Sequence, residues 1–275
     1  MRRGWRQIWR GSGYNEAMKI AVIGAGAAGI MAALNAARGG AEVTLFERNP
    51  VVAKKILVTG AGRCNLGNCA VSPAAYHCAD AEWTAKFLDR FGAAELRDQF
   101  EKLGIPLMTT DDGWYYPLSQ SARSVAEILE ERLREGGVRL RVATEVEWFS
   151  RKEERFLLKI NQNGQQSGEY FDALVVAAGG KAYPELGSAG RLFPALEHLG
   201  HQVLPHHPAL GPILVELQAF RQLKGQRFDA ICSLYADGER LGSTFGNLIV
   251  TEKGFNGPGV MNLSHWVALN QGKML

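Results

Sequence analysis

The stretch KIAVIGAGAAGIMAALNAARGGAEVTLFE, residues 19–47, decides the fold of this 275-residue chain. Its apolar run 19–23 stops at a glycine, as a strand buried on both faces does. The alanine-rich segment 27–38 predicts a helix closed by a pair of glycines, and residues 42–47 predict a second buried strand. A strand, a helix and a strand in this order indicate a parallel pair with a right-handed crossover.

A glycine motif of the form GxGxxG joins the first strand to the helix, with glycines at positions 24, 26 and 29. The first allows a tight turn, the second lets the backbone approach a pyrophosphate, and the third lets helix and strand pack closely. Glu47 stands 23 positions after Gly24 at the end of the second strand. An acid there accepts from a ribose hydroxyl and repels a 2′-phosphate, so the site suits FAD or NAD and disfavours NADP.

Periodicity predicts the elements that follow this unit. Apolar residues at helical spacing indicate two helices between residues 81 and 103, broken near Gly92, and a third that stops at two glycines, 136 and 137. Residues 138–146 predict one strand, and the alternating stretches after it predict an antiparallel meander beside the parallel sheet. The run ALVVAAGG, residues 173–180, predicts another buried strand.

After Gly200 the composition changes to a segment rich in histidine and proline, which indicates a domain boundary. Strand-like runs at 213–217, 230–235 and 247–251, with a turn at Asp237, predict a small all-β unit.

Three parts are therefore expected. Residues 1–17 form a tail outside the fold, residues 18–205 an FAD/NAD(P)-binding domain, and residues 206–275 a β-rich unit, which the family resemblance described below implies is the start of an insert domain for substrate. Two explanations of the Arg-rich tail stay open: a transit-type presequence, or an upstream start codon with Met18 as the functional beginning, which we favour.

Composition excludes several classes of function. The net charge of +3 is accounted for within the first seventeen residues, which hold four arginines and one glutamate, so the rest of the chain is neutral. A nucleic-acid or anionic-membrane partner therefore finds no basic surface in the body of the protein. Four cysteines without a CxxC pair indicate neither a disulfide framework nor a zinc site, and they fit a reducing cytoplasm. No metal site is expected from Cys69, His77 and Cys78 either.

Four sequence blocks carry a family resemblance. KKILVTGAGRCNLGN (54–68) contains a second glycine-rich turn, and GWYYPLSQSARSV (113–125), AAGGKAYPELGSAG (177–190) and TEKGFNGPGVMNLS (251–264) follow it in order. Together they resemble the signature of the bacterial NAD(P)/FAD-dependent oxidoreductases of the BaiN-like or aminoacetone-oxidase-like flavoprotein family. The resemblance implies an α/β fold: a glutathione-reductase-like FAD-binding domain, with a parallel sheet and a β-meander, followed by an incomplete β-barrel-like insert domain.

The resemblance also implies FAD as cofactor, with NAD(P)H as a candidate electron donor, and assigns cofactor-binding positions. The diphosphate would contact the first glycine turn, and the adenosine ribose would contact Glu47. The second glycine turn would line the path from the pyrophosphate to the flavin, and the backbone of Val146 would meet the adenine. These positions are Gly24, Gly26, Ala28, Gly29, Glu47, Lys55, Gly60, Gly62, Arg63, Cys64, Asn65, Val146, Ala178 and Gly179.

Three points stay open or depart from the family. Cys64 follows a cation in a glycine loop, which would lower the pKa of its thiol, but a small packed residue is an equal interpretation. Arg191 and Asn256 replace an acidic residue and a hydroxyl residue of the family pattern. No Gly-Asp occurs in the sequence, whereas the family closes its FAD domain with a late Gly-Asp or Gly-Glu, so a C-terminally truncated chain is expected.

The function that these observations favour is an FAD-dependent oxidoreductase that transfers a hydride between flavin and a small organic substrate or NAD(P)H. The family names suggest enone reduction or amine oxidation, and no side chain decides between them. Two alternatives stay beside it: a flavoprotein that binds FAD and acts through a partner, and an inactive fragment. Catalytic residues and oligomeric state are left open by the sequence.

Overall fold

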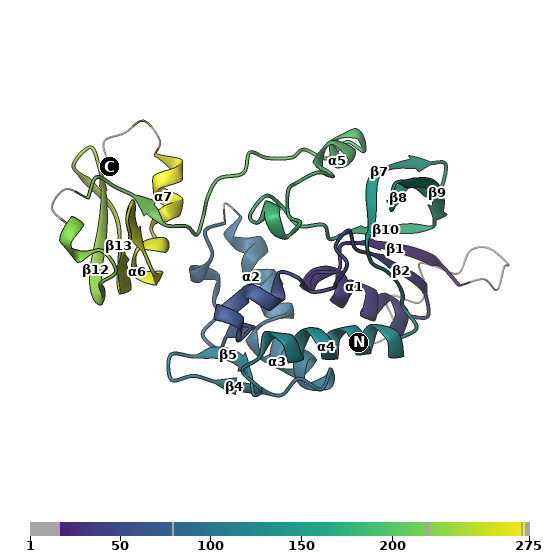
Figure 1. The fold of residues 1–275 in the computed structure, drawn as a ribbon, viewed down its shortest axis with the longest axis horizontal. Helices are drawn as coiled ribbons and strands as arrows, with labels where there is room; N and C mark the ends of the chain where they lie inside the picture. The colour runs from purple at the N-terminus through teal and green to yellow at the C-terminus, as the bar shows by residue number, and fades with distance from the viewer. Residues whose placement is uncertain (1–16, 79, 218–219, 271, 273–275) are drawn as a thin grey trace. The chain divides into compact units, whose positions relative to one another are not determined.

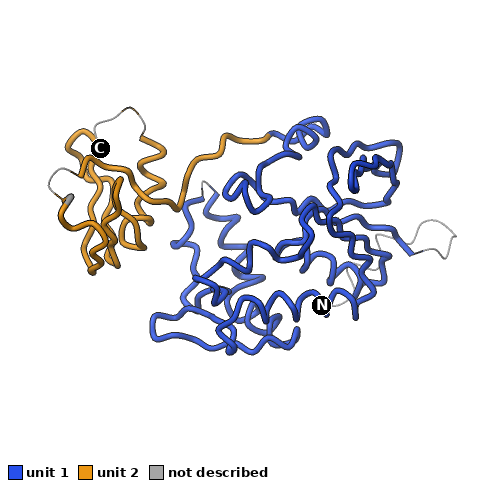
Figure 2. Tube along the Cα trace, viewed as in Figure 1, with its two compact units in different colours: residues 1–202 blue, residues 203–275 orange. Residues whose placement is uncertain are grey.

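The computed structural model describes residues 17–78, 80–217, 220–270 and 272. These residues form two compact units, one ending at Gln202 and the other starting at Val203 (Figure 2). The expected tail, residues 1–17, lies outside the described residues apart from Ala17.

The first unit is built on a four-stranded parallel sheet with the strand order β10-β1-β2-β6. The element that opens it is confirmed: α1 (Ala27–Arg38) joins two strands that pair in parallel. Chain order and spatial order differ because the last strand pairs beside the first. The strands are β1 (Lys19–Ile23), β2 (Glu42–Phe46), β6 (Arg139–Arg141) and β10 (Ala173–Val176).

Alternating side chains of β1 divide the core of this unit into two layers. Val22 packs in the cluster formed with α1 and α4 (Ala122–Glu135), whereas Ala21 and Ile23 pack in the cluster formed with the meander. The sheet is therefore buried on both faces, with helices on one side and the predicted antiparallel meander on the other (Figure 1). The meander strands are β7 (Thr144–Lys152), β8 (Arg155–Gln162) and β9 (Gln165–Phe171).

The single strand predicted over residues 138–146 is wrong, because the chain leaves the parallel sheet within it. Ala143 has a left-handed backbone conformation, with φ of 49°, between β6 and β7. Backbone bonds fix this bend against the end of β2: the Ala143 N–H donates to the Asn49 carbonyl, and the Thr144 N–H donates to the Glu47 carbonyl, both at 2.9 Å. A hydrophobic pattern cannot report such a bend, since polar and apolar residues alternate in both parts.

Between β2 and α4 lies a subdomain of short elements. The two helices predicted between residues 81 and 103 are confirmed as α2 (Ala81–Arg90) and α3 (Ala93–Lys102), separated by Gly92, which caps α3. A small sheet of order β3-β5-β4 accompanies them. Its strands are β3 (Gly67–Asn68), β4 (Leu107–Thr109) and β5 (Trp114–Pro117), and the subdomain also holds η1 (Ile56–Gly62) and η2 (Pro73–Ala75). Two further short helices of the first unit follow β10: η3 (Pro184–Leu186) and α5 (Phe193–His198).

The second unit is a four-stranded antiparallel sheet of order β11-β14-β13-β12. The predicted turn at Asp237 joins β12 to β13, where Asp237 and Gly238 both have positive φ. An all-β composition is wrong, because two short helices follow the strands. The elements are β11 (Ile213–Leu214), η4 (Arg221–Leu223), β12 (Arg227–Ala236), β13 (Glu239–Val250), β14 (Gly254–Asn256), α6 (Pro258–Met261) and α7 (Ser264–Leu269).

Within the described ranges, every helix is too short or too polar to span a membrane. The apolar run of residues 20–37 is instead divided between β1 and α1.

Candidate functional site

The first glycine turn has the geometry that a dinucleotide requires. Gly24 has a φ of +98°, and a Cβ there would lie 2.6 Å from the carbonyl oxygen of Ala177. A Cβ on Gly29 would lie 1.8 Å from the carbonyl oxygen of Gly24. Gly26 differs, because a Cβ there would meet nothing within 4 Å. Gly24 and Gly29 are therefore required by the close packing of the turn, whereas Gly26 borders open space.

Gly26 is also the N-cap of α1, and no side chain caps that helix end. The first turn of α1 carries no acidic residue, and Ala28 there is exposed. Unpaired N–H groups and the positive end of the helix dipole thus face the open space beside Gly26. An anionic diphosphate fits this position on both counts.

Glu47, at the end of β2, is buried, with 8% of its surface exposed, and its carboxylate is already engaged with the protein. Its Oε2 accepts from the backbone N–H of Ala25 at 2.8 Å, inside the first glycine turn. Its Oε1 accepts from the backbone N–H of Asn49 at 2.8 Å and from the Asn49 side-chain Nδ2 at 2.6 Å. The acid expected at the ribose therefore also fixes the turn that precedes it.

The second glycine turn, in η1 and the residues after it, contains four consecutive or near-consecutive positive φ values: Gly60, Ala61, Gly62 and Cys64. A Cβ on Gly60 would lie 2.8 Å from the backbone nitrogen of Asn65, whereas one on Gly62 would meet nothing within 4 Å. The turn repeats the arrangement of the first: one glycine is required by packing and another borders open space. Asn65 stabilises the exit of the turn, because its Oδ1 accepts from the Gly67 N–H at 3.1 Å.

Arg63 in this turn is exposed and lies over the ring of Tyr116, with 4.5 Å from the guanidinium carbon to the ring centroid. Its Nη2 donates to the Tyr116 hydroxyl at 3.4 Å, and its Nε donates to the Gly60 carbonyl at 3.4 Å. The guanidinium group is thus oriented by an aromatic ring and by its own loop. It remains a cation at the edge of the open turn.

Cys64 does not have the environment of a reactive thiolate. Only 2% of its surface is exposed, and burial raises the pKa of the thiol above its ordinary value, against a smaller opposing effect of the hydrogen bond with Thr59. Of the two interpretations that the sequence left open, the structure supports the packed residue. The preceding cation does not lower this pKa: burial is the larger effect, and the Arg63 guanidinium group lies over the Tyr116 ring.

The segments that the sequence singled out meet around Ser188, which is 6% exposed. The Lys55 Nζ donates to the Ser188 Oγ at 2.8 Å, which ties the second glycine stretch to the block that follows β10. A Cβ on Gly179 would lie 2.5 Å from the same Oγ. Since Gly24 packs on Ala177, the first turn, the second turn and the turn after β10 form one continuous site.

This site lies at the carboxyl ends of β1, β2 and β10, where ligands bind in open α/β sheets. Val146 is not part of these turns. Its side chain is buried in the cluster of the meander, and its backbone pairs with Ile160. Contact of Val146 with adenine stays a prediction. The two family departures have local roles, since Arg191 donates to Glu145 and the Asn256 Oδ1 accepts from the Gly257 N–H.

Three residues of the site were missed by sequence reasoning: Asn49, Lys54 and Ser188. The Lys54 Nζ donates to the Asn49 Oδ1 at 3.1 Å and to the Glu185 carbonyl at 3.5 Å. Their signals were present in the sequence, since Lys54 precedes Lys55 in the KK pair and Ser188 belongs to the GSAG segment. For Asn49 the only signal in the sequence was its position two residues after Glu47.

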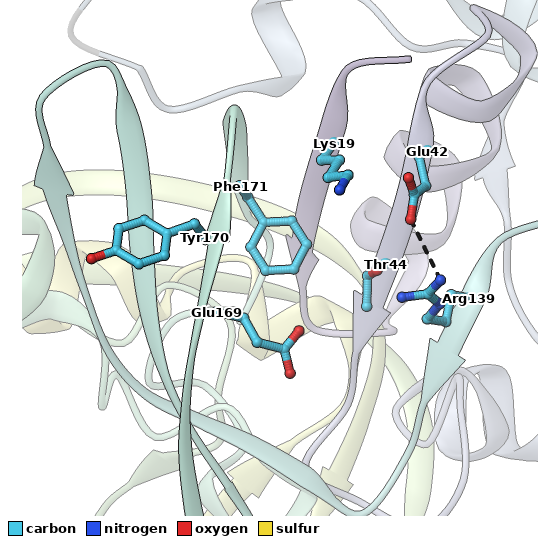
Figure 3. Close-up of a pocket in the computed structure, with 7 residues that line it drawn as sticks. All are labelled: Lys19, Glu42, Thr44, Arg139, Glu169, Tyr170 and Phe171. Atoms are coloured by element: carbon cyan, nitrogen blue, oxygen red, sulfur yellow. Dashed lines mark hydrogen bonds and ion pairs between the residues drawn. The ribbon is translucent and has the colours of Figure 1, made fainter. Parts of the chain in front are cut away.

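A separate partly open pocket lies at the opposite edge of the sheet (Figure 3). It is lined by the first residues of three parallel strands, Lys19, Glu42 and Arg139, and by the end of β9. The Arg139 guanidinium pairs with the Glu42 carboxylate on one side of it (Figure 3). Because its walls are the amino ends of the strands, this pocket is not where a nucleotide binds in this topology.

No group of three or more His, Cys, Asp or Glu side chains that could hold a metal ion occurs within the part of the chain that the structure describes. Cys69 and Cys78, considered above for such a site, are exposed free cysteines.

Comparison with known proteins gives both a family and relatives. The family model described as "HI0933-like protein Rossmann domain" matches residues 18–254. The 3-dehydro-bile acid delta(4,6)-reductase of Clostridium scindens is 35% identical over 261 residues, which is 93% of this chain and 62% of that protein. The ribosomal RNA dihydrouridine synthase of Escherichia coli is 30% identical over 252 residues, 91% of this chain and 61% of that protein. The chain thus spans about three fifths of the length of these relatives.

A solved structure, that of the 3-ketosteroid-delta4-(5alpha)-dehydrogenase from Rhodococcus jostii, superposes with a TM-score of 0.49 at 19% identity. The superposed part covers 62% of this chain and 47% of that one.

Proposed function

The chain belongs to the HI0933-like family of Rossmann-domain proteins, and on that basis we propose that it is the FAD-binding part of a flavin-dependent oxidoreductase. One observation carries the proposal: the open space beside Gly26 at the start of α1 lies next to the buried carboxylate of Glu47 at the end of β2. A diphosphate and a ribose need these two features side by side.

The residues of the chain fit FAD along the whole site. The N–H groups of the first turn would hold the diphosphate, and Glu47 would accept from a hydroxyl of the adenosine ribose. The open second turn at Gly62 and the guanidinium group of Arg63 would face the flavin half, where Arg63 supplies positive charge. When bound and reduced, FAD supplies a hydride that no amino-acid side chain can provide.

The names of the relatives support one reaction class over the other that the sequence left open. A delta(4,6)-reductase and a dihydrouridine synthase both add hydrogen across a carbon–carbon double bond. In a 3-oxo steroid and in uracil such a bond is conjugated with a carbonyl group. The proposed reaction adds a hydride to one carbon and a proton to the other, while NAD(P)H is oxidised to NAD(P)⁺ as the electron source. Amine oxidation receives no such support.

A small enone, such as a 3-oxo-4-ene steroid, is the substrate we propose first, because the bile-acid enzyme is the more similar of these two relatives. Uridine in ribosomal RNA is the second candidate, supported by the name of the Escherichia coli relative. Charge opposes the second candidate: after the first seventeen residues the chain is neutral, whereas RNA binding depends on clustered Lys and Arg.

The test starts with reconstitution of the purified 275-residue chain with FAD, followed by anaerobic addition of NADH or NADPH. Retained flavin that is bleached by one of the two donors and reoxidised by a 3-oxo-4-ene steroid supports the first candidate. Reoxidation by a ribosomal RNA fragment, with dihydrouridine detected by mass spectrometry, supports the second. Flavin that binds but never turns over indicates a partner-dependent flavoprotein, and failure to retain FAD contradicts the proposal.

A further inference from the structure

Asn49 lies between the acid of the site and a lysine. Its backbone N–H and its side-chain Nδ2 both donate to the Glu47 Oε1, at 2.8 and 2.6 Å. Its Oδ1 accepts from the Lys54 Nζ at 3.1 Å. The Nδ2 also lies 3.5 Å from the carbonyl of Leu186, the last residue of η3.

Lys54 fixes which way the Asn49 amide faces. An ammonium group has donors and no acceptor, so only the amide oxygen can satisfy it. The NH₂ group is then directed to Glu47, which as a carboxylate offers only acceptors. The two charged neighbours therefore select one of the two amide orientations, and the opposite orientation would place like groups together at both ends.

The consequence concerns the lone pairs of Glu47. Its Oε1 is satisfied by the two Asn49 donors, and its Oε2 accepts one bond, from the Ala25 N–H. Each carboxylate oxygen has two lone pairs, so Oε2 keeps one acceptor site. That oxygen is the one on the side of the glycine turn.

We infer that Asn49 is a positioning residue for the dinucleotide: by engaging Glu47 Oε1, it holds Oε2 toward the first glycine turn, to accept one hydroxyl of the adenosine ribose. This inference rests on the proposed function and adds to it a residue that touches no cofactor. Lys54 acts one step further out, by orienting the Asn49 amide.

The test is binding of ADP, measured by titration calorimetry on the 275-residue chain, because ADP carries the diphosphate and the ribose without the flavin. Asn49→Asp is isosteric and can pair with Lys54, so the variant should fold, and its melting temperature is measured at each pH to confirm that the folded chain is titrated. It replaces the NH₂ donor by a second carboxyl oxygen beside Glu47. Two carboxyl groups this close share a proton in acid and repel each other when both are ionised.

The expected result is a ratio of wild-type to variant ADP affinity that rises with pH; the ratio is compared because the terminal phosphate of ADP itself loses a proton in this range. At about pH 5.5 the shared proton substitutes for the amide donor, and ADP affinity should approach that of the wild type. At about pH 8.5 affinity should be about tenfold lower or more, since the bond to Oε1 is lost and Glu47 turns away. Among the described residues, the charged side chains that flank the pair are Lys54, which donates to Asn49, and Arg48, which stands between Glu47 and Asn49 in the sequence. Because Lys54 orients the Asn49 amide, Lys54→Met should weaken ADP binding at every pH by a smaller factor.

Asn161→Asp is the matched control. The Asn161 Nδ2 donates to the Glu147 Oε1 at 2.7 Å, on exposed strands of the meander, so the same chemical change is made to another Asn–Glu pair. It should leave ADP affinity equal to that of the wild type at each pH. An Asn49→Asp chain whose ADP affinity matches that of this control at each pH overturns the inference while wild-type binding stands. Absence of ADP and FAD binding by the wild type overturns the proposed function as well.

Discussion

The ammonium group of Lys55 donates a 2.8 Å hydrogen bond to the hydroxyl of Ser188, although 133 positions separate the two residues. Lys55 precedes the second glycine turn in the sequence, and Ser188 packs on Gly179, which follows β10. This bond joins the two halves of the nucleotide domain on the side where we place the flavin. Its loss should therefore affect both folding and cofactor retention.

Lys55→Met and Ser188→Ala test that bond as a pair. Each single variant should lower the free energy of unfolding by about 1 kcal/mol, because one partly buried intramolecular hydrogen bond is lost. The double variant should cost little more than either single one, giving a coupling energy of about 1 kcal/mol in denaturant titrations. FAD should also dissociate faster from both, as followed by recovery of flavin fluorescence. Strictly additive effects would show that the bond contributes nothing.

Gly26→Ala and Gly29→Ala separate binding from folding within one motif. A Cβ on Gly29 would collide with the carbonyl oxygen of Gly24 at 1.8 Å, so this variant should lose about 3 kcal/mol of stability or fail to fold. Gly26 has an extended backbone with φ of −84° and open space around it, so Gly26→Ala should change stability by less than about 1 kcal/mol.

The Gly26→Ala methyl group would instead occupy the space assigned to the diphosphate. ADP and FAD affinity should fall by about tenfold or more in a chain with a nearly unchanged melting temperature. Unaltered ADP affinity in this variant would place the diphosphate elsewhere.

Cys64 should be the slowest-reacting of the cysteines toward iodoacetamide at neutral pH. Burial raises the pKa of its thiol, which favours the unreactive protonated form, while Cys69 and Cys78 are exposed. Peptide mass mapping after timed alkylation gives the order directly, and unfolding in guanidinium should abolish it. Rapid labelling of Cys64 in the folded chain would revive the reactive-thiolate interpretation.

The same shift gives a pH dependence of stability. The folded chain holds the Cys64 proton more tightly than the unfolded chain does, because the folded-state pKa is the higher of the two. This contribution is fully present below the ordinary thiol pKa and is lost as pH rises through the raised value. Cys64→Ala should therefore reduce the loss of stability at alkaline pH. Cys232, whose pKa burial also raises, should leave a residual slope.

Tyr116 should control the orientation of Arg63. Tyr116→Phe keeps the ring under the guanidinium group and loses only a weak 3.4 Å bond, whereas Tyr116→Leu removes the ring. In the FAD-loaded protein, sulfite affinity reports positive charge near the oxidised flavin. It should be nearly unchanged in Tyr116→Phe and reduced in both Tyr116→Leu and Arg63→Gln. Equal sulfite affinity in all four proteins would place Arg63 away from the flavin.

Local patterns were sufficient for much of the first unit. The periodicity and the glycines of residues 19–47 predicted β1, α1 and β2, because burial on both faces and positive φ are properties of short segments. The meander, α2 and α3 were also predicted, because the spacing of their apolar residues is a property of short segments. The helices α6 and α7 were not predicted, since each is at most six residues long and shows too little periodicity to be recognised.

What the sequence by itself determined was the strand–helix–strand unit, its glycine turn and the acid that ends β2. The tertiary structure alone decided that Glu47 is held by Asn49, that Lys55 meets Ser188, that Cys64 is buried and that the chain bends at Ala143. The physical reason is the range of the interactions. A turn or a buried strand is specified by neighbouring residues, whereas a hydrogen bond across 133 positions and the burial of one thiol depend on how the whole sheet is packed.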